Sequence, residues 1–84
     1  MLYKELTITN KEGLKSRLAA LFVQIASRYE SQILIESGNK KVNAKSIMGV
    51  LSLGIQQGGA IYVLANGKDE KVALAALEEL VSKE

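Results

Sequence analysis

The first part of the chain shows two hydrophobic periods in succession. Apolar and polar residues alternate over positions 2–8, the period of two that is expected for a strand with one buried face. The turn NKEG at 10–13 follows, and Ser16 is then a suitable N-cap for a helix to about Tyr29. Apolar residues at helical spacing predict one buried stripe on that helix, formed by Leu18, Leu21, Phe22, Ile25, Ala26 and Tyr29.

Two short apolar segments in the middle of the chain predict a hairpin. Residues 32–36 are rich in isoleucine, and residues 40–43 form a second short strand. Between them stands the dipeptide Gly38-Asn39, which is typical of a tight hairpin turn. These two strands are therefore expected to pair in antiparallel fashion.

The last part of the chain predicts a short helix, a strand and a longer helix. Ser46 begins a helix that runs to about Leu53, and Gly54 is a suitable stop. The apolar segment 60–65 predicts a buried strand, and Asp69 can cap the final helix. The residues of that helix expected to face inward are Ala73, Leu74, Leu77, Leu80 and Val81.

The element order is therefore β-α-β-β-α-β-α, without a linker or an internal repeat. Residues 1–84 are interpreted as a single domain. The simplest architecture is an α+β open-faced β-sandwich, in which three helices cover one face of an antiparallel four-stranded sheet.

Composition narrows the range of functions. Hydrophobic residues make up 48% of the 84, which argues against disorder, and the net charge of +2 is too small to indicate nucleic-acid binding. Neither cysteine nor histidine is present, so we expect no metal site, no cofactor and no histidine-based proton transfer. No signal peptide or membrane span is evident, and a cytoplasmic location is expected.

Ser46 has two interpretations. Its hydroxyl could simply cap the short helix, which is the common role of a serine before an apolar segment. Alternatively it is a phosphorylation site, because a phosphate at a helix N-terminus meets a favourable dipole and would leave the fold intact while it changes the surface charge.

The short helix has more apolar residues than one face of it can bury. Val50 and Leu53 lie at i, i+3 spacing and can fill the core. The others lie on a different side, so they are either further core residues or an exposed surface for a partner. The candidate partner-binding residues are Ile47, Met48 and Leu51, with Ala20 and Val23 from the outer side of the first helix.

The segment EGLKSRLAALF, residues 12–22, places two cations where the first helix begins. Lys15 and Arg17 flank the helix start, whose unpaired backbone N–H groups and dipole already attract anions. The segment is therefore a candidate site for a phosphate or for an acidic partner.

The segments EGLKSRLAALFVQIASRY and VNAKSIMGVLSLG resemble the active-site helix and the regulatory serine segment of the HPr phosphocarrier family of the bacterial sugar phosphotransferase system. The similarity extends over essentially the whole chain, and the family's open-faced β-sandwich agrees with the predicted element order. The family carries phosphate on a histidine in the pattern G-[ILM]-H-A-R-P. Here Lys15 occupies the histidine position, Leu18 replaces the proline and Arg17 is retained.

The resemblance implies a non-catalytic protein. A lysine ammonium has no lone pair to attack a phosphoryl donor, so phosphate transfer to sugar permeases is not expected. The histidine-less subgroup called Crh fits best. By resemblance, HPr kinase/phosphorylase would phosphorylate Ser46, and the product would act as corepressor for a LacI-type catabolite control protein. Lys15 and Arg17 would then form a docking surface next to the apolar residues.

Two other functions and two oligomeric states remain open from the sequence. The chain could bind a metabolic enzyme constitutively, without phosphorylation, or it could be a phosphocarrier with an altered nucleophile. It could be a monomer, or the NKEG turn could act as a hinge for a strand-exchanged homodimer.

Overall fold

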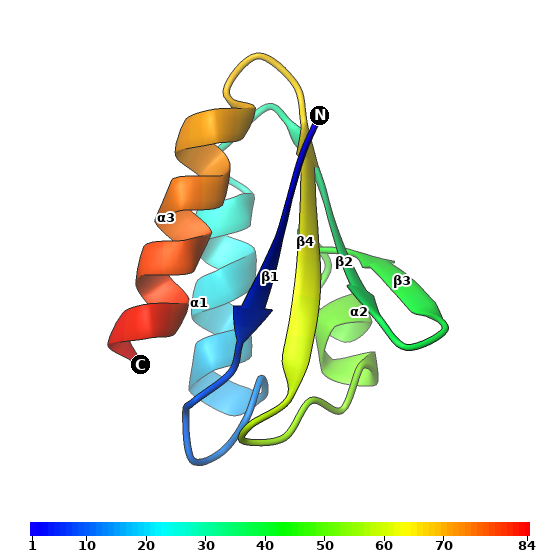
Figure 1. Cartoon of the computed structure of the whole chain (residues 1–84), viewed down its shortest axis with the longest axis vertical. Coiled ribbons are helices and arrows are strands. Elements are labelled where there is room, and N and C mark those ends of the chain that lie inside the picture. Colours follow the sequence, from blue (N-terminus) through cyan, green and yellow to red (C-terminus); the bar gives the residue numbers. More distant parts are fainter.

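The computed structural model describes residues 1–84 as one sheet and three helices (Figure 1). The four strands are antiparallel and lie in the order β1-β4-β2-β3. The elements are β1 (Leu2–Thr7), α1 (Ser16–Ala26), β2 (Gln32–Ser37), β3 (Lys40–Asn43), α2 (Ile47–Ser52), β4 (Ala60–Asn66) and α3 (Glu70–Lys83).

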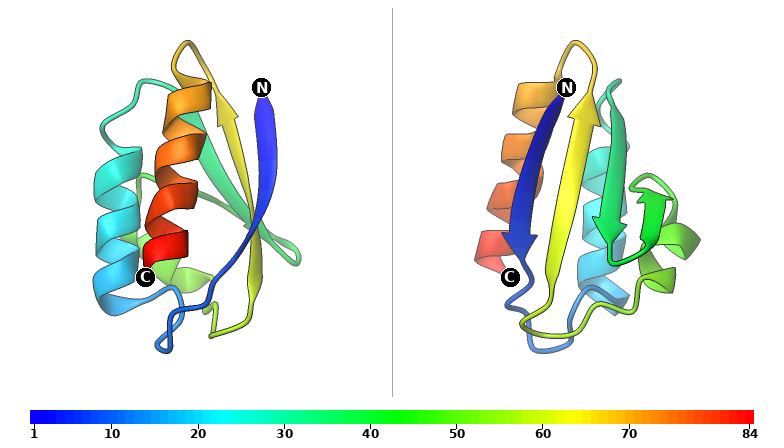
Figure 2. Two further views of the ribbon diagram at one scale, coloured as in Figure 1. Left: turned by 60° about the vertical axis from the view of Figure 1, so that its left-hand side comes forward. Right: turned by 45° about the vertical axis from the view of Figure 1, so that its right-hand side comes forward.

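All three helices lie on the same side of the sheet (Figure 2). Helices α1 and α3 cover the sheet, and α2 packs beside β3 and α1. Nineteen buried hydrophobic residues form one core between these layers, with Phe22 of α1 fully enclosed. The predicted open-faced α+β sandwich is therefore confirmed. No helix is both long enough and apolar enough to cross a membrane.

The central strand β4 differs from the prediction of a buried strand. Only Ile61, Val63 and Ala65 are buried, while Tyr62 and Leu64 are half-exposed. The reason is that helices cover one face only, so alternate residues of a central strand point to the uncovered face.

Both ends of α1 differ from the prediction. The N-cap is Lys15 rather than Ser16, and its side chain makes no cap hydrogen bond. The helix ends at Ala26 instead of Tyr29, because Arg28 N–H and Tyr29 N–H bond to carbonyls three residues earlier, as in a tighter 3₁₀ turn.

The buried stripe of α1 is also narrower than predicted. Leu21, Ile25 and Tyr29 are only half-buried, whereas Ala19 is fully buried beside Phe22. In α3 the predicted inward residues are buried apart from Leu80, which is half-buried.

Asp69 stands at the N-cap position of α3 but does not cap it with its side chain. Its carboxylate instead accepts hydrogen bonds from the α1–β2 connection, from the backbone N–H groups of Glu30 and Ser31 at 2.9 and 3.0 Å. The predicted position at the helix start is therefore correct, but the partners of the side chain belong to another part of the chain.

Candidate functional site

The loop before α1 is held against the loop before β4 by a close backbone approach. Leu14 N–H donates to the Ile55 carbonyl at 2.9 Å, and the Leu14 side chain is fully buried. A Cβ at Gly13, whose φ is +76°, would lie 2.2 Å from the Ile55 oxygen. Only glycine fits there without a backbone shift. This contact, which the sequence analysis missed, fixes where Lys15 begins the helix.

A polar hollow lies beside the start of α1. It is lined by Lys11, Glu12, Lys15, Ser16, Gln56 and Gln57, with no hydrophobic residue among them. The two glutamines come from the α2–β4 loop and were not identified as site residues from the sequence. Ser16 has a φ of +52°, a strained conformation for a residue other than glycine and one that is enriched at functional sites.

Arg17 points its guanidinium to the far end of α3. Its Nη1 lies 3.1 Å from Glu84 Oε1, and 76% of its side chain is exposed. An exposed ion pair of this kind contributes little to stability. Lys15, Ser16 and Arg17 thus present cations and free helix N–H groups to solvent, an arrangement that can bind an anion but holds no nucleophilic base.

Ser46 caps α2 as predicted. Its Oγ accepts a hydrogen bond from Gly49 N–H at 3.1 Å, and its backbone is extended. The serine is partly exposed. The hydroxyl is an acceptor here, and a phosphate in its place could still accept from the same N–H groups.

The lysines on either side of this segment already have acceptors. Lys45 Nζ donates to the Tyr29 carbonyl at 2.6 Å, after the end of α1, and Lys40 Nζ donates to the Ser52 carbonyl at 2.8 Å. Both cations therefore stabilise helix ends.

The exposed apolar residues of α2 lie next to Ser46. Ile47, Met48 and Leu51 are 40%, 73% and 40% exposed, whereas Val50 is fully buried. Of the two alternatives for these three residues, the structure therefore favours the exposed surface. We call Ile47, Met48 and Leu51 the α2 patch.

Helix α1 packs against α2 and extends this surface only in part. Ala20 is exposed, as predicted for the outer side of α1. Val23 is half-buried and packs against the core, because α2 and its neighbours partly cover it. Its contribution to an exposed surface is smaller than predicted.

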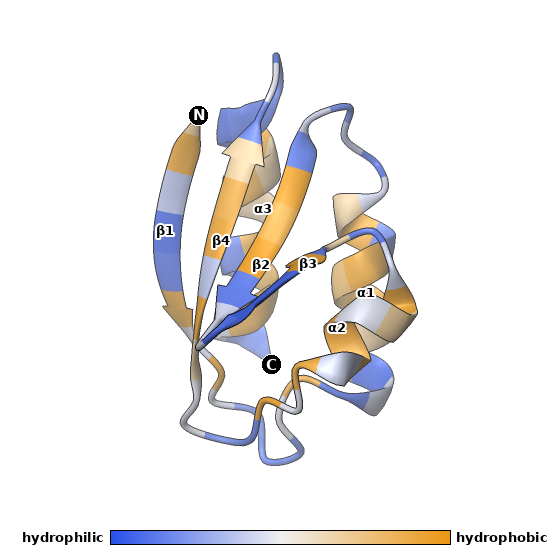
Figure 3. Cartoon of the chain, turned by 90° about the vertical axis from the view of Figure 1, so that its right-hand side faces the viewer, coloured by the Kyte–Doolittle hydropathy of each residue, from blue (hydrophilic) through white to orange (hydrophobic).

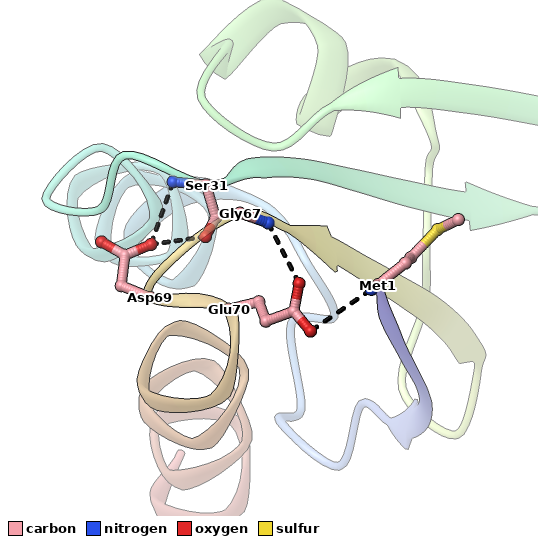
Figure 4. A network of polar contacts seen from close by, with 5 residues as sticks. All are labelled: Met1, Ser31, Gly67, Asp69 and Glu70. Carbon is pink, nitrogen blue, oxygen red and sulfur yellow. Dashed lines mark hydrogen bonds and ion pairs between the residues drawn. The ribbon is translucent and has the colours of Figure 1, made fainter.

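A polar network at the opposite end of the molecule joins three segments (Figure 4). The Ser31 hydroxyl donates to Asp69, and this bond, followed by the Glu30 backbone N–H, holds the pKa of Asp69 below its usual value. Glu70 accepts from Gly67 N–H at 3.0 Å and pairs with the Met1 amino group at 3.3 Å. The Gly67 bond is the main cause of the lowered pKa of Glu70. Neither acid lies near Ser46 or Lys15, so this network is structural.

The comparisons with known proteins agree with this geometry. The family model described as the PTS HPr component phosphorylation site matches residues 2–83. The chain is 49% identical to HPr-like protein Crh of Halalkalibacterium halodurans over 84 residues, which are all of both chains.

Two crystal structures show the same fold. HPr-C-His from Thermoanaerobacter tengcongensis is 52% identical, with a TM-score of 0.97 over 99% of this chain and 93% of that one. Crh from Bacillus subtilis, described as a swapped dimer, is 44% identical, with a TM-score of 0.78 over 100% of this chain and 97% of that one.

The fold and the altered phosphate site together define the class: the chain belongs to the HPr family. Within that family it is similar both to HPr and to the HPr-like protein Crh, at comparable identity. Overall similarity therefore does not separate the two groups. What separates this chain from a histidine phosphocarrier is Lys15 at the family's histidine position and the absence of any histidine.

Proposed function

We propose that this chain is a regulatory protein of carbon catabolite repression, switched by phosphorylation of Ser46. HPr kinase/phosphorylase would add the phosphate, and the phosphorylated form would bind a LacI-type catabolite control protein as corepressor. The single observation that carries the proposal is the position of Ser46, partly exposed, at the start of α2 and next to the α2 patch. The similarity to Crh, whose structure is described as that of a catabolite repression protein, supports the same function.

The chemistry of the switch follows from the capping geometry. Ser46 lies where unpaired N–H groups and the helix dipole favour negative charge, so phosphorylation adds charge without breaking α2. Lys45 and Lys40 are bonded to carbonyls, so the phosphate remains available to a basic group of the partner. The α2 patch supplies apolar area next to that charge.

The cations at the start of α1 have a supporting role in this proposal. Lys15 and Arg17 are exposed and lie on the loop and helix beside α2. They would contact acidic or polar groups of the partner, together with Ala20 and the exposed part of Val23. No phosphoryl transfer through Lys15 is part of the mechanism, because its ammonium offers no lone pair.

The test combines a modification assay and a binding assay. The chain is incubated with HPr kinase/phosphorylase and ATP, and intact mass and peptide mapping should show one phosphate on Ser46 and none on Ser46→Ala. The phosphorylated chain should then bind the catabolite control protein more tightly than the unmodified chain does.

A matched pair of surface variants tests the patch. Met48→Asp should abolish the gain in affinity, whereas Val72→Asp, at an exposed apolar residue of α3, should leave it unchanged. Phosphorylation without tighter binding would contradict the corepressor function. Equal binding with and without phosphate would favour a constitutive interaction domain, and acid-labile phosphate on Lys15 would favour an altered carrier.

We also propose that strand exchange is accessible to this chain. Strand β1 lies at the sheet edge and pairs only with β4, through six residue pairs. The NKEG turn that follows could open as a hinge, and the Crh structure from Bacillus subtilis is described as a swapped dimer. Size-exclusion chromatography after slow concentration should yield a dimer that persists on dilution; a monomer under all conditions would contradict this.

A further inference from the structure

The sheet face that no helix covers carries an ordered arrangement of side chains, which we call the outer face. Figure 3 views the chain from this side, with α3 behind the strands. The strand register aligns its residues in three rows across the sheet. The rows are Asn66 and Gln32; then Tyr3, Leu64, Leu34 and Asn43; then Glu5, Tyr62, Glu36 and Lys41.

The middle of the outer face is apolar. Leu64 and Leu34 are adjacent in register, and both are half-exposed although they belong to the two central strands. The Tyr3 and Tyr62 rings stack next to them with centroids 5.4 Å apart. Met1, Leu34 and Leu64 also line a small hollow of about 180 Å³ together with polar residues. A contiguous apolar surface of this kind is typical of an interaction site.

The charges of the outer face are placed on opposite edges. Glu5 lies on β1 and Lys41 on β3, at the two ends of one row. Three strand spacings separate them, about 14 Å, so they cannot pair within one chain. Lys41 has only a long contact to Glu36, at 3.6 Å, and Glu5 has no basic partner in the structure.

We propose that the outer face binds the same face of a second copy of this chain, about a two-fold axis parallel to the strands. Such an axis places β1 of one copy over β3 of the other and β4 over β2, and it keeps each row opposite itself. Glu5 then faces Lys41 of the partner subunit, and the same pair forms again on the other side of the axis. Like charges are nowhere directly opposed.

The other rows are complementary under the same axis. Leu64 lies over the partner's Leu34, and the amide of Asn66 lies over that of the partner's Gln32, where each can donate and accept. In the charged row the Tyr62 hydroxyl faces the partner's Glu36 and can donate to it. Sheets that pack face to face with nearly aligned strands lie about 10 Å apart, which these side chains span.

The size of the outer face sets the strength of the dimer. Four strands of about six residues cover roughly 20 Å by 20 Å, or about 400 Å² from each copy. The total is below the roughly 1,200 Å² of a standard stable interface, so the dimer is weak and in rapid exchange. It leaves the α2 patch and Ser46 free on both copies, and it does not depend on the proposed function.

A charge-exchange experiment tests the proposal. Self-association of the full chain is measured by sedimentation and by concentration-dependent NMR shifts, from micromolar to millimolar protein at low salt. Lys41→Glu alone, and Glu5→Lys alone, should each weaken association about tenfold, because both symmetric pairs become repulsive. The double variant should restore it to within about threefold of the unmodified chain.

Two further measurements separate the outer-face dimer from unfolding of the variants and from strand exchange. Thermal unfolding of each variant should show that the monomer fold is intact. A spin label on Thr7→Cys, mixed with unlabelled chain, should broaden the β3 amides of the unlabelled copy, whereas a label on Gln24→Cys of α1 should broaden none of them. A strand-exchanged dimer differs because it persists on dilution and does not respond to the charge exchange.

Shifts that do not change up to millimolar protein would overturn the proposal. So would concentration-dependent shifts confined to α1 and α2, or a double variant that associates no better than the single ones.

Discussion

Two serines at opposite ends of the molecule show how differently the fold uses one residue type. Ser46 is partly exposed, and its hydroxyl accepts one hydrogen bond from Gly49 N–H, three residues away. Ser31 is 1% exposed, and its hydroxyl donates to Asp69, thirty-eight residues away. A phosphate could replace the first hydroxyl because it is also an acceptor. It could not replace the second, which must donate a proton in a buried site. Accessibility and the direction of the hydrogen bond together make a modifiable serine.

The largest expected effect concerns the loop that positions the site end of the molecule. Gly13→Ala should lower the free energy of unfolding by about 2–4 kcal/mol, because a positive φ and a backbone overlap with Ile55 add. Urea denaturation measures this. Gly54→Ala is the matched control, since its φ is +61° but nothing lies within 4 Å of the added Cβ. A similar loss in both variants would show that the close approach adds nothing to the cost of the positive φ.

Ser31→Ala should have the next largest effect, at the other end of the molecule. The loss of a buried hydroxyl bonded to a carboxylate should lower the free energy of unfolding by about 1–3 kcal/mol. Phosphorylation of Ser46 in this variant should proceed as in the unmodified chain. A slower modification would show that the two ends are coupled.

The Asp69 network should also make stability depend on pH. Because the pKa of Asp69 is lowered in the folded chain, its contribution is present above the ordinary pKa of an aspartate. It is lost as the pH falls through the folded value. Melting temperatures of the chain and of Asp69→Asn, measured from neutral pH into the acid range, should therefore converge as the pH falls. Glu70, whose pKa is also lowered, leaves part of the dependence in the variant. Parallel curves would contradict this assignment.

Ser46→Ala should cost about 1 kcal/mol of stability, the usual value of an N-cap. Ser46→Asp should cost little or nothing, because a carboxylate also accepts from the first helical N–H groups and suits the dipole. Thermal and urea unfolding of the two variants distinguish them. If Ser46→Asp is the less stable, a negative charge is not accommodated at this helix start and the switch loses its structural basis.

Arg17→Ala should have the smallest effect on stability, no more than about 0.5 kcal/mol, because its ion pair with Glu84 is on the surface. Its effect should appear in binding instead, as a weaker complex between the phosphorylated chain and the catabolite control protein. An unchanged affinity in the titration would remove Arg17 from the docking surface. Lys83→Ala, which loses only the exposed pair with Glu79, is the control.

Local patterns predicted the elements and the capping serine because those features depend on residues close in sequence. The strand 40–43 and the hairpin turn at Gly38-Asn39 are present as expected. The Ser46 cap joins residues three apart. Errors occurred where a nearby competitor was equally suitable, as at the start of α1, where Lys15 takes the cap position from Ser16.

The sequence by itself determined the types and order of the elements, the open-faced architecture and the absence of a histidine to carry phosphate. Only the tertiary structure decided which segments meet. It placed Ile55 against Gly13, Asp69 against Ser31 and Glu84 against Arg17, the last two pairs 38 and 67 residues apart. It also aligned the rows of the outer face, because strand register depends on pairing between distant segments, which no local pattern specifies.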